Sequence, residues 1–215
     1  MDILSISLGR DGYNKVIKKA LDDTMWRGNG KLVLCSGSNM GNIRSMTFPA
    51  SAMGVIAVNS ASANGAPSDF NARSTKPEKR LSILGEKVSS AWLTTLPGDD
   101  ESTKNAYATH ITNGTSVATP IAAGVVALIL QLAMIDIPGE EDTKKILDEV
   151  LPWLQGYEGM MAVLMGMVVE KGGYFNIVPQ MLLNPNWPEE RRVNRIANRL
   201  REILSDHFGD LREGP

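Results

Sequence analysis

The sequence predicts an α/β domain built on a mostly parallel β-sheet. Three observations predict this class: a strand–helix–strand succession over residues 4–35, a further apolar strand at residues 55–58, and a long apolar helix over residues 116–135. Two strands separated by one helix are typical of a parallel pair joined by a right-handed crossover. Because parallel strands are buried on both faces, we expect helices to cover the sheet.

The first half of the chain supplies most of the strand signals. Residues 4–8 alternate apolar and serine side chains and stop at Gly9, which is typical of a strand. Residues 12–27 carry lysines and aspartates mostly on one helical face. The apolar face of that helix consists of Val16, Ile17, Ala20, Leu21 and Met25. Residues 31–35 then indicate a short second strand, rich in Leu and Val.

The second half begins with loops and ends with helices. Residues 60–80 are rich in Ser, Ala, Asn and Gly and indicate a loop, whereas residues 97–105 indicate an acidic surface loop. Short strands are expected at 81–84 and 88–93, and helices at 141–150, 158–170 and 189–207. The sequence therefore predicts two domains, an α/β body over residues 1–135 and a helical extension over residues 136–215.

Composition excludes several classes of function. A net charge of −2 gives no reason to expect a nucleic-acid partner, and the apolar run 121–135 is shorter than the ~20 residues of a membrane span. The only cysteine is Cys35, which excludes an internal disulfide and fits a reducing compartment. No spacing of His, Cys and Asp suggests a metal site, and no cofactor is expected. With no signal-peptide pattern, a cytoplasmic location is expected.

The segment 113–124, Asn-Gly-Thr-Ser-Val-Ala-Thr-Pro-Ile-Ala-Ala-Gly, carries the clearest chemical signal. Gly114 allows a sharp turn, and Thr115 or Ser116 can cap the helix that follows. Pro120 lies early enough in that helix to remove no important donor. The Ser116 hydroxyl would then lie at the positive end of a helix, where a nucleophile is favoured. The alternative is a Ser/Thr-capped core helix without chemistry.

A second polar segment, Cys35-Ser-Gly-Ser-Asn-Met-Gly41, follows the predicted strand 31–35. Acyl transfer by a serine needs a nucleophile, a base and donors for the oxyanion. The small residues here allow a substrate backbone to approach closely, and the Asn39 amide can donate a hydrogen bond. The alternative is a polar turn, because Asn is common in turns.

Together these two segments resemble the subtilases, the subtilisin-like serine proteases. The run Gly-Thr-Ser-x-Ala-Thr-Pro-x-x-Ala-Gly matches the family's serine motif, and the resemblance implies that Ser116 is the nucleophile and Asn39 the oxyanion donor. Ser38 stands where the family usually has glycine. Since the resemblance covers residues 2–135, it implies the C-terminal half of a catalytic domain, a partial three-layer subtilisin-like fold followed by the helical extension.

Weaker matches extend the resemblance to the substrate cleft. Ser7, Leu8 and Gly9 look like the segment that pairs with an extended substrate, and Phe48-Pro-Ala50 looks like the border of the specificity pocket. On that alignment Gly9 lines one wall of the pocket, and the other wall is lined by Cys35, Ser36 and Gly37. The segment from Leu154 to Pro179 is similar to an extension found in some fungal subtilases.

The general base has no counterpart in the sequence. The family takes its acid and base from an Asp-x-Gly and a His-Gly-Thr segment, and neither occurs here. His110 and His207 are expected to be structural or surface residues. The chain therefore reads as an incomplete serine endopeptidase, inactive alone, whose expected partners are a peptide or protein substrate and a missing N-terminal half supplying Asp and His. The alternative is a non-catalytic peptide-binding module derived from a subtilase.

Overall fold

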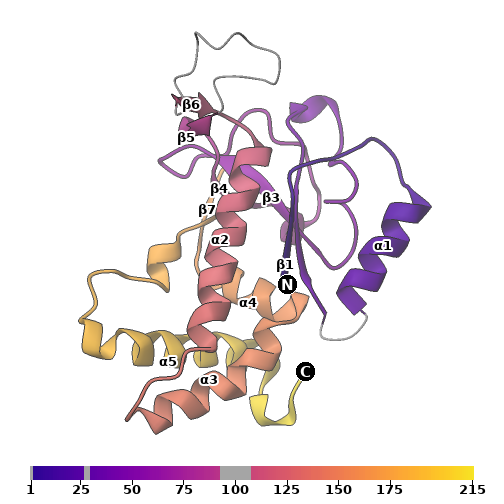
Figure 1. Cartoon of the computed structure of the whole chain (residues 1–215). Coiled ribbons are helices and arrows are strands. Elements are labelled where there is room, and N and C mark those ends of the chain that lie inside the picture. Colours follow the sequence, from indigo (N-terminus) through magenta and orange to yellow (C-terminus); the bar gives the residue numbers. More distant parts are fainter. Residues whose placement is uncertain (1, 27–29, 93–107) are drawn as a thin grey trace, which may run out of the picture.

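A mixed β-sheet runs through the centre of the molecule in the computed structural model, which describes residues 2–26, 30–92 and 108–215 (Figure 1). The strands lie in the order β1-β2-β3-β4-β8-β7, and all neighbours are parallel except the antiparallel pair β8 and β7. Their bounds are β1 Ile3–Ile6, β2 Leu32–Ser36, β3 Val55–Ala61, β4 Leu81–Leu84, β7 Val168–Lys171 and β8 Tyr174–Ile177. The predicted α/β class with a mostly parallel sheet is confirmed.

The sheet has two apolar faces, and alternate residues of each strand serve different cores. In β2, Leu32 and Leu34 join the larger core, whereas Val33 and Cys35 join the smaller one. This period of two follows from strand geometry, in which successive side chains point to opposite faces. Every residue of β2 and β3 is buried, as expected for central parallel strands.

Helices cover both faces. Helix α1 (Lys15–Trp26) closes the smaller core, and Asn14 Oδ1 caps it by accepting hydrogen bonds from the amides of Val16 and Ile17, both at 3.0 Å. Helix α2 (Thr115–Ala133) packs against β1, β2, β3 and β4 on the other face. The extension has three helices, α3 (Glu141–Leu154), α4 (Tyr157–Met165) and α5 (Glu189–Phe208). Helix α3 packs on α2, and the three pack on one another.

Helix α2 is long and apolar enough to cross a membrane by length and composition, so the expectation that no segment would reach that threshold was too strict. Nine of its side chains are buried, mostly against the sheet, as in the core helix of a folded domain. Its outer face includes exposed Leu128, so the helix is less fully buried than the sequence suggested.

Three sequence predictions need correction. The helix expected at 158–170 ends at Met165, and the chain then forms the β7–β8 hairpin, whose strand β8 pairs with β4; the extension is therefore not wholly helical. Val16 was placed on the buried face of α1 but is 78% exposed. The first strand ends at Ile6, two residues before the alternating pattern does. The predicted acidic loop 97–105 lies outside the described residues.

Because β1, β2, β3 and β4 are parallel, their carboxyl ends meet at one edge of the sheet. We call this the carboxyl edge and define it by residues 7–9, 35–39, 85 and 113–116. The small antiparallel pair of β5 (Val88–Trp92) and β6 (Ala108–Thr112) leads from β4 to the start of α2. Parallel α/β sheets bind ligands at this edge.

Candidate active site

Ser116 lies in the first turn of α2 and is partly exposed. Gly114 precedes that turn with a φ of 149°, a conformation that favours glycine, and its amide donates to the Gly85 carbonyl at 2.8 Å. Gly85 is itself tightly enclosed, since a Cβ there would lie 2.5 Å from Ser60 Oγ and 2.9 Å from the Gly114 carbonyl. Two closely packed backbone segments therefore fix the position of Ser116.

Asn39, in the loop that follows β2, caps the start of α2. Its Oδ1 accepts hydrogen bonds from the Thr115 amide at 2.8 Å and from Thr115 Oγ1 at 2.9 Å. The expectation that Thr115 or Ser116 would cap the helix is therefore wrong, because the acceptor comes from the loop after β2. Because Oδ1 accepts both of these hydrogen bonds, Nδ2 is the end of the amide that is left to donate.

The Asn39 amide and the Ser116 hydroxyl converge. A Cβ built on Gly114 would lie 3.0 Å from Asn39 Nδ2 and 3.1 Å from Ser116 Oγ, so both groups border one small space. The backbone amide of Ser116 belongs to the first turn of α2, where amides have no intrahelical partner. The Ser116 hydroxyl oxygen and the Asn39 amide nitrogen thus border the same small space, at the positive end of a helix.

Ser7 joins β1 to this turn. Its Oγ donates a hydrogen bond to the Ser116 carbonyl at 2.8 Å, so the side chain faces α2. Leu8 and Gly9 follow in an exposed segment, with Leu8 76% exposed. The backbone of residues 8–9 is therefore open to solvent at the end of an edge strand, where an extended peptide can pair with it.

Gly37, which was expected to line the opposite wall, is buried, and Thr47 lies beside it. Thr47 donates to the Gly37 carbonyl through its amide at 3.1 Å and its hydroxyl at 3.3 Å, and a Cβ on Gly9 would overlap that hydroxyl. Sequence reasoning did not single out Thr47. The signal available was its position directly before Phe48-Pro-Ala50.

Cys35 and Ser36 lie behind this wall. Cys35 is fully buried in the α1-side core, and burial raises the pKa of its thiol to about 12. A thiol with that pKa is protonated at neutral pH and is unsuited to nucleophilic attack. Ser36 is buried at the end of β2. Both residues, which were expected to line the wall, are therefore buried.

Ser38 has an unusual backbone conformation. Its φ is 141°, a region that favours glycine, and its Oγ accepts a hydrogen bond from the Met40 amide at 3.3 Å. The residue directly before the oxyanion candidate therefore holds a conformation that costs free energy for any residue with a Cβ.

Neither histidine acts on Ser116 in the described structure. His110 lies on β6 with an exposed side chain, opposite Ser90 in the register. His207 lies near the end of α5, edge-on to Phe208 at 4.5 Å between ring centroids. Among the described residues, no hydrogen bond links the Ser116 hydroxyl to a base, and no group of three or more His, Cys, Asp or Glu could hold a metal ion.

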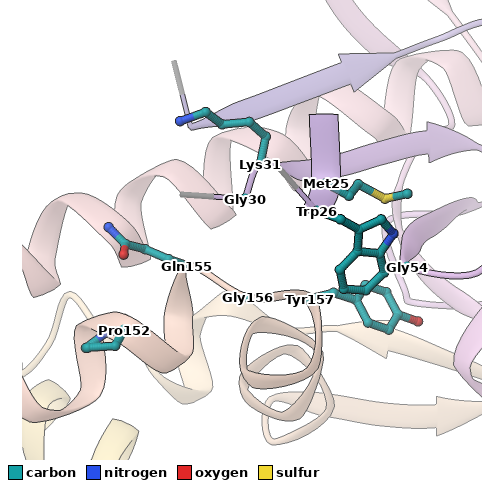
Figure 2. A pocket seen from close by; sticks show the side chains of 9 residues that line it. All are labelled: Met25, Trp26, Gly30, Lys31, Gly54, Pro152, Gln155, Gly156 and Tyr157. Atoms are coloured by element: carbon teal, nitrogen blue, oxygen red, sulfur yellow. The ribbon is translucent and has the colours of Figure 1, made fainter. Parts of the chain in front are cut away.

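A cavity of about 230 Å³ lies elsewhere, at the amino ends of the strands (Figure 2). Gly30 and Lys31 precede β2 and Gly54 precedes β3, whereas Trp26 closes α1 and Tyr157 opens α4. This cavity separates α1 from the turn between α3 and α4. Because it lies at the opposite edge of the sheet from Ser116, it is not part of the candidate active site.

Comparison with known proteins identifies the family. The sequence model of the subtilase family matches residues 1–149, more than half of the chain. The chain belongs to the subtilase family. This subtilase is 30% identical over 131 residues to the minor extracellular protease Epr of Bacillus subtilis (strain 168), and 31% identical over 133 residues to subtilisin amylosacchariticus of Bacillus subtilis subsp. amylosacchariticus.

These alignments cover 61% and 60% of the subtilase chain but only 18% and 31% of the two relatives, so the chain spans less than a third of their length. A solved structure of the prenylagaramide maturation protease PagA matches with a TM-score of 0.59. That match covers 94% of this chain and 62% of the other, at 20% sequence identity. It shows a shared fold, whereas family membership rests on the sequence.

Proposed function

We propose that this chain is part of a serine endopeptidase that cleaves peptide bonds through an acyl-enzyme on Ser116. One observation carries the proposal: Ser116 Oγ and Asn39 Nδ2 lie within 3.1 Å of a common point at the start of α2. A tetrahedral oxyanion at that point would accept hydrogen bonds from Asn39 Nδ2 and the Ser116 amide. The substrate would lie extended between residues 7–9 and Gly37, with Thr47 limiting the depth of the pocket.

The reaction forms and breaks bonds in two halves. Ser116 Oγ attacks the carbonyl carbon while a base takes its proton, and that proton then passes to the leaving nitrogen as the C–N bond breaks. Water, deprotonated by the same base, then releases the acyl group from Ser116. Without a base, a serine of this kind loses about 10⁶-fold in turnover, a value the subtilisins themselves provide.

We also propose that the base and its carboxylate partner come from an Asp-x-Gly and a His-Gly-Thr segment outside this chain, which represents the C-terminal half of the catalytic domain. The sequence between Leu154 and Pro179 favours a relationship to the fungal type. On this proposal, the chain alone is inactive and its partners are a protein substrate and the N-terminal half.

Labelling with a fluorophosphonate tests the proposal, because such probes react with an activated serine. We expect no labelling of the isolated chain above that of Ser116→Ala. Mixing with the N-terminal half of a longer relative should produce labelling that maps to Ser116 by peptide mass. Thr119→Ala, which removes a buried hydroxyl one turn along α2, is the matched control and should label like the parent chain.

The second candidate is a non-catalytic peptide-binding module. The exposed backbone of residues 8–9 favours it, since this segment could bind a peptide without chemistry. Retained peptide binding with no labelling of Ser116, alone or in the mixture, would support the module and contradict the endopeptidase.

A further inference from the structure

A groove of about 500 Å³ lies between the loop that follows β3 and the turn of the β7–β8 hairpin. The hairpin follows residue 149, where the family match ends, so the groove is formed by the family body together with the extension. The two parts are in close contact, because a Cβ on Gly172 would lie 2.9 Å from Pro67. The lining residues used below are Asp69, Arg73, Arg80, Gly173 and Tyr174.

The charged side chains that line this groove are two arginines and one aspartate. The Arg80 guanidinium lies over the Phe175 ring at 5.6 Å from its centroid, which holds the plane of the group. Its Nε is buried and has no hydrogen-bond partner in the described part of the chain. The terminal nitrogens of the guanidinium are the donors that a planar anion in the groove can reach, and Nη1 lies 3.6 Å from the position of a Cβ on Gly173.

The groove adjoins the loop that begins at the oxyanion candidate. The Gly41 amide donates to the Phe70 carbonyl at 2.8 Å, and Ser45 forms a parallel β-bridge with Arg73. Both contacts join the loop after Asn39 to the segment that lines the groove. The groove therefore lies beside the loop that follows Asn39, while Arg80 and Tyr174 themselves stand at the amino ends of β4 and β8.

We propose that this groove binds the side-chain carboxylate of an acidic residue in the bound peptide. Arg80 is the principal contact, since guanidinium groups match the geometry of carboxylates. The inference rests on the proposed function only in taking a peptide as the ligand. It assigns the β7–β8 hairpin a part in selecting that peptide.

Isothermal titration calorimetry of the full chain at low salt tests the proposal. The probes are acetyl-Glu-Glu-Glu-amide and the isosteric acetyl-Gln-Gln-Gln-amide. We expect only the Glu peptide to bind measurably, and Arg80→Gln to weaken it about tenfold, the size of one charge-assisted hydrogen bond. Arg199→Gln makes the same change on the exposed face of α5 and should have no effect.

A second variant does not depend on the fold tolerating a change at Arg80. Asp69 is exposed and is the acidic residue of the groove, so Asp69→Asn should tighten binding of the Glu peptide several-fold. Equal affinity for the two peptides, or unchanged affinity in both variants, would overturn the proposal. So would binding of a Gln peptide with a free C-terminus as tight as that of the Glu peptide, because the terminal carboxylate would then be the ligand. Since binding is measured without chemistry, failure of Ser116 to label would leave this result unaffected.

Discussion

The carboxyl edge and the helical extension are stabilised in different ways. Ten of the eleven buried polar or charged residues in the described structure precede residue 136, and Thr143 is the exception. Several of them hold the edge directly, such as Ser60 beside Gly85 and Asn59, whose Nδ2 donates to the carbonyls of Lys79 and Leu81. The extension instead buries apolar side chains at helical spacing, for example Leu200 and Leu204 of α5.

This difference shows which region has the more narrowly defined atomic geometry. Apolar packing is non-directional and tolerates substitutions of similar volume, whereas a buried hydrogen bond fixes two atoms relative to each other. The edge therefore gains defined geometry from its polar contacts, and the extension gains free energy of unfolding from burial. Substitutions in the two regions should separate these effects.

The largest effect should come from the extension. Leu200 is fully buried among α3, α4 and α5, so Leu200→Ala should lower the free energy of unfolding by about 3 kcal/mol through lost burial and a cavity. Urea unfolding followed by circular dichroism measures the change. Leu128→Ala, at a position 52% exposed on α2, is the control and should change stability by less than about 1 kcal/mol. Equal losses in both variants would contradict the packing argument.

At the carboxyl edge, Gly85→Ala should cost between about 2 and 3 kcal/mol, because the new methyl group meets backbone and side-chain atoms at 3.0 Å or less. Gly124→Ala provides the opposite outcome within the same body. Nothing lies within 4 Å of a Cβ there, and alanine in a helix should stabilise by about 1 kcal/mol. Thermal melts of both variants test this contrast. A shift of the melting temperature in the same direction for both variants would contradict it.

Lys79 is a buried cation at the amino ends of β3 and β4, and its effect should depend on pH. Its Nζ donates to the carbonyls of Ala52 at 2.6 Å and Val55 at 2.7 Å, and burial lowers its pKa from 10.5 to about 8. Between pH 8 and 10.5 the unfolded chain binds more protons than the folded chain, so this residue's contribution to stability rises with pH across that window.

The matching variant is Lys79→Met, which cannot titrate. The difference in free energy of unfolding between the parent chain and the variant should shift in favour of the parent by about 2 kcal/mol from pH 7 to pH 10. Chemical denaturation at the two pH values gives this number. A difference that stays constant would mean that Lys79 titrates alike in the folded and unfolded chains.

The smallest effect concerns strain at a single residue. Ser38→Gly should raise the free energy of unfolding by about 1 kcal/mol, because glycine adopts a φ of 141° without a Cβ penalty. Ser51→Gly makes the same change at an exposed turn position without a positive φ and should destabilise slightly. If Ser38→Gly also destabilises, the hydrogen bond from the Met40 amide to Ser38 Oγ outweighs the strain.

Much of the fold could be predicted from the sequence because it rests on local patterns. The alternation in β1, the apolar run of β3 and the helical period of α5 each predicted the element that forms. The β7–β8 hairpin was missed because its residues continue the apolar character of α4, and pairing with β4 is a long-range contact.

For the candidate site, the sequence motifs brought Ser116 and Asn39 to attention, but their roles remain proposals. What the motifs could not supply was the partner of each group. The capping of α2 by Asn39 and the bond from Ser7 to the Ser116 carbonyl join residues 76 and 109 positions apart. Spacing in a sequence carries no information about such pairs, which only the assembled sheet brings together.

The carboxamide at position 39 has two ends with different surroundings. Its oxygen fastens the start of α2, and its nitrogen borders the space beside Gly114. Asn39→Ala would remove both amide atoms at once, so the effect of a loosened helix could not be separated from that of a lost hydrogen-bond donor. Aspartate keeps the fastening oxygen and replaces the N–H donor with a charged acceptor, so Asn39→Asp should abolish the proposed anion binding while the start of α2 stays held.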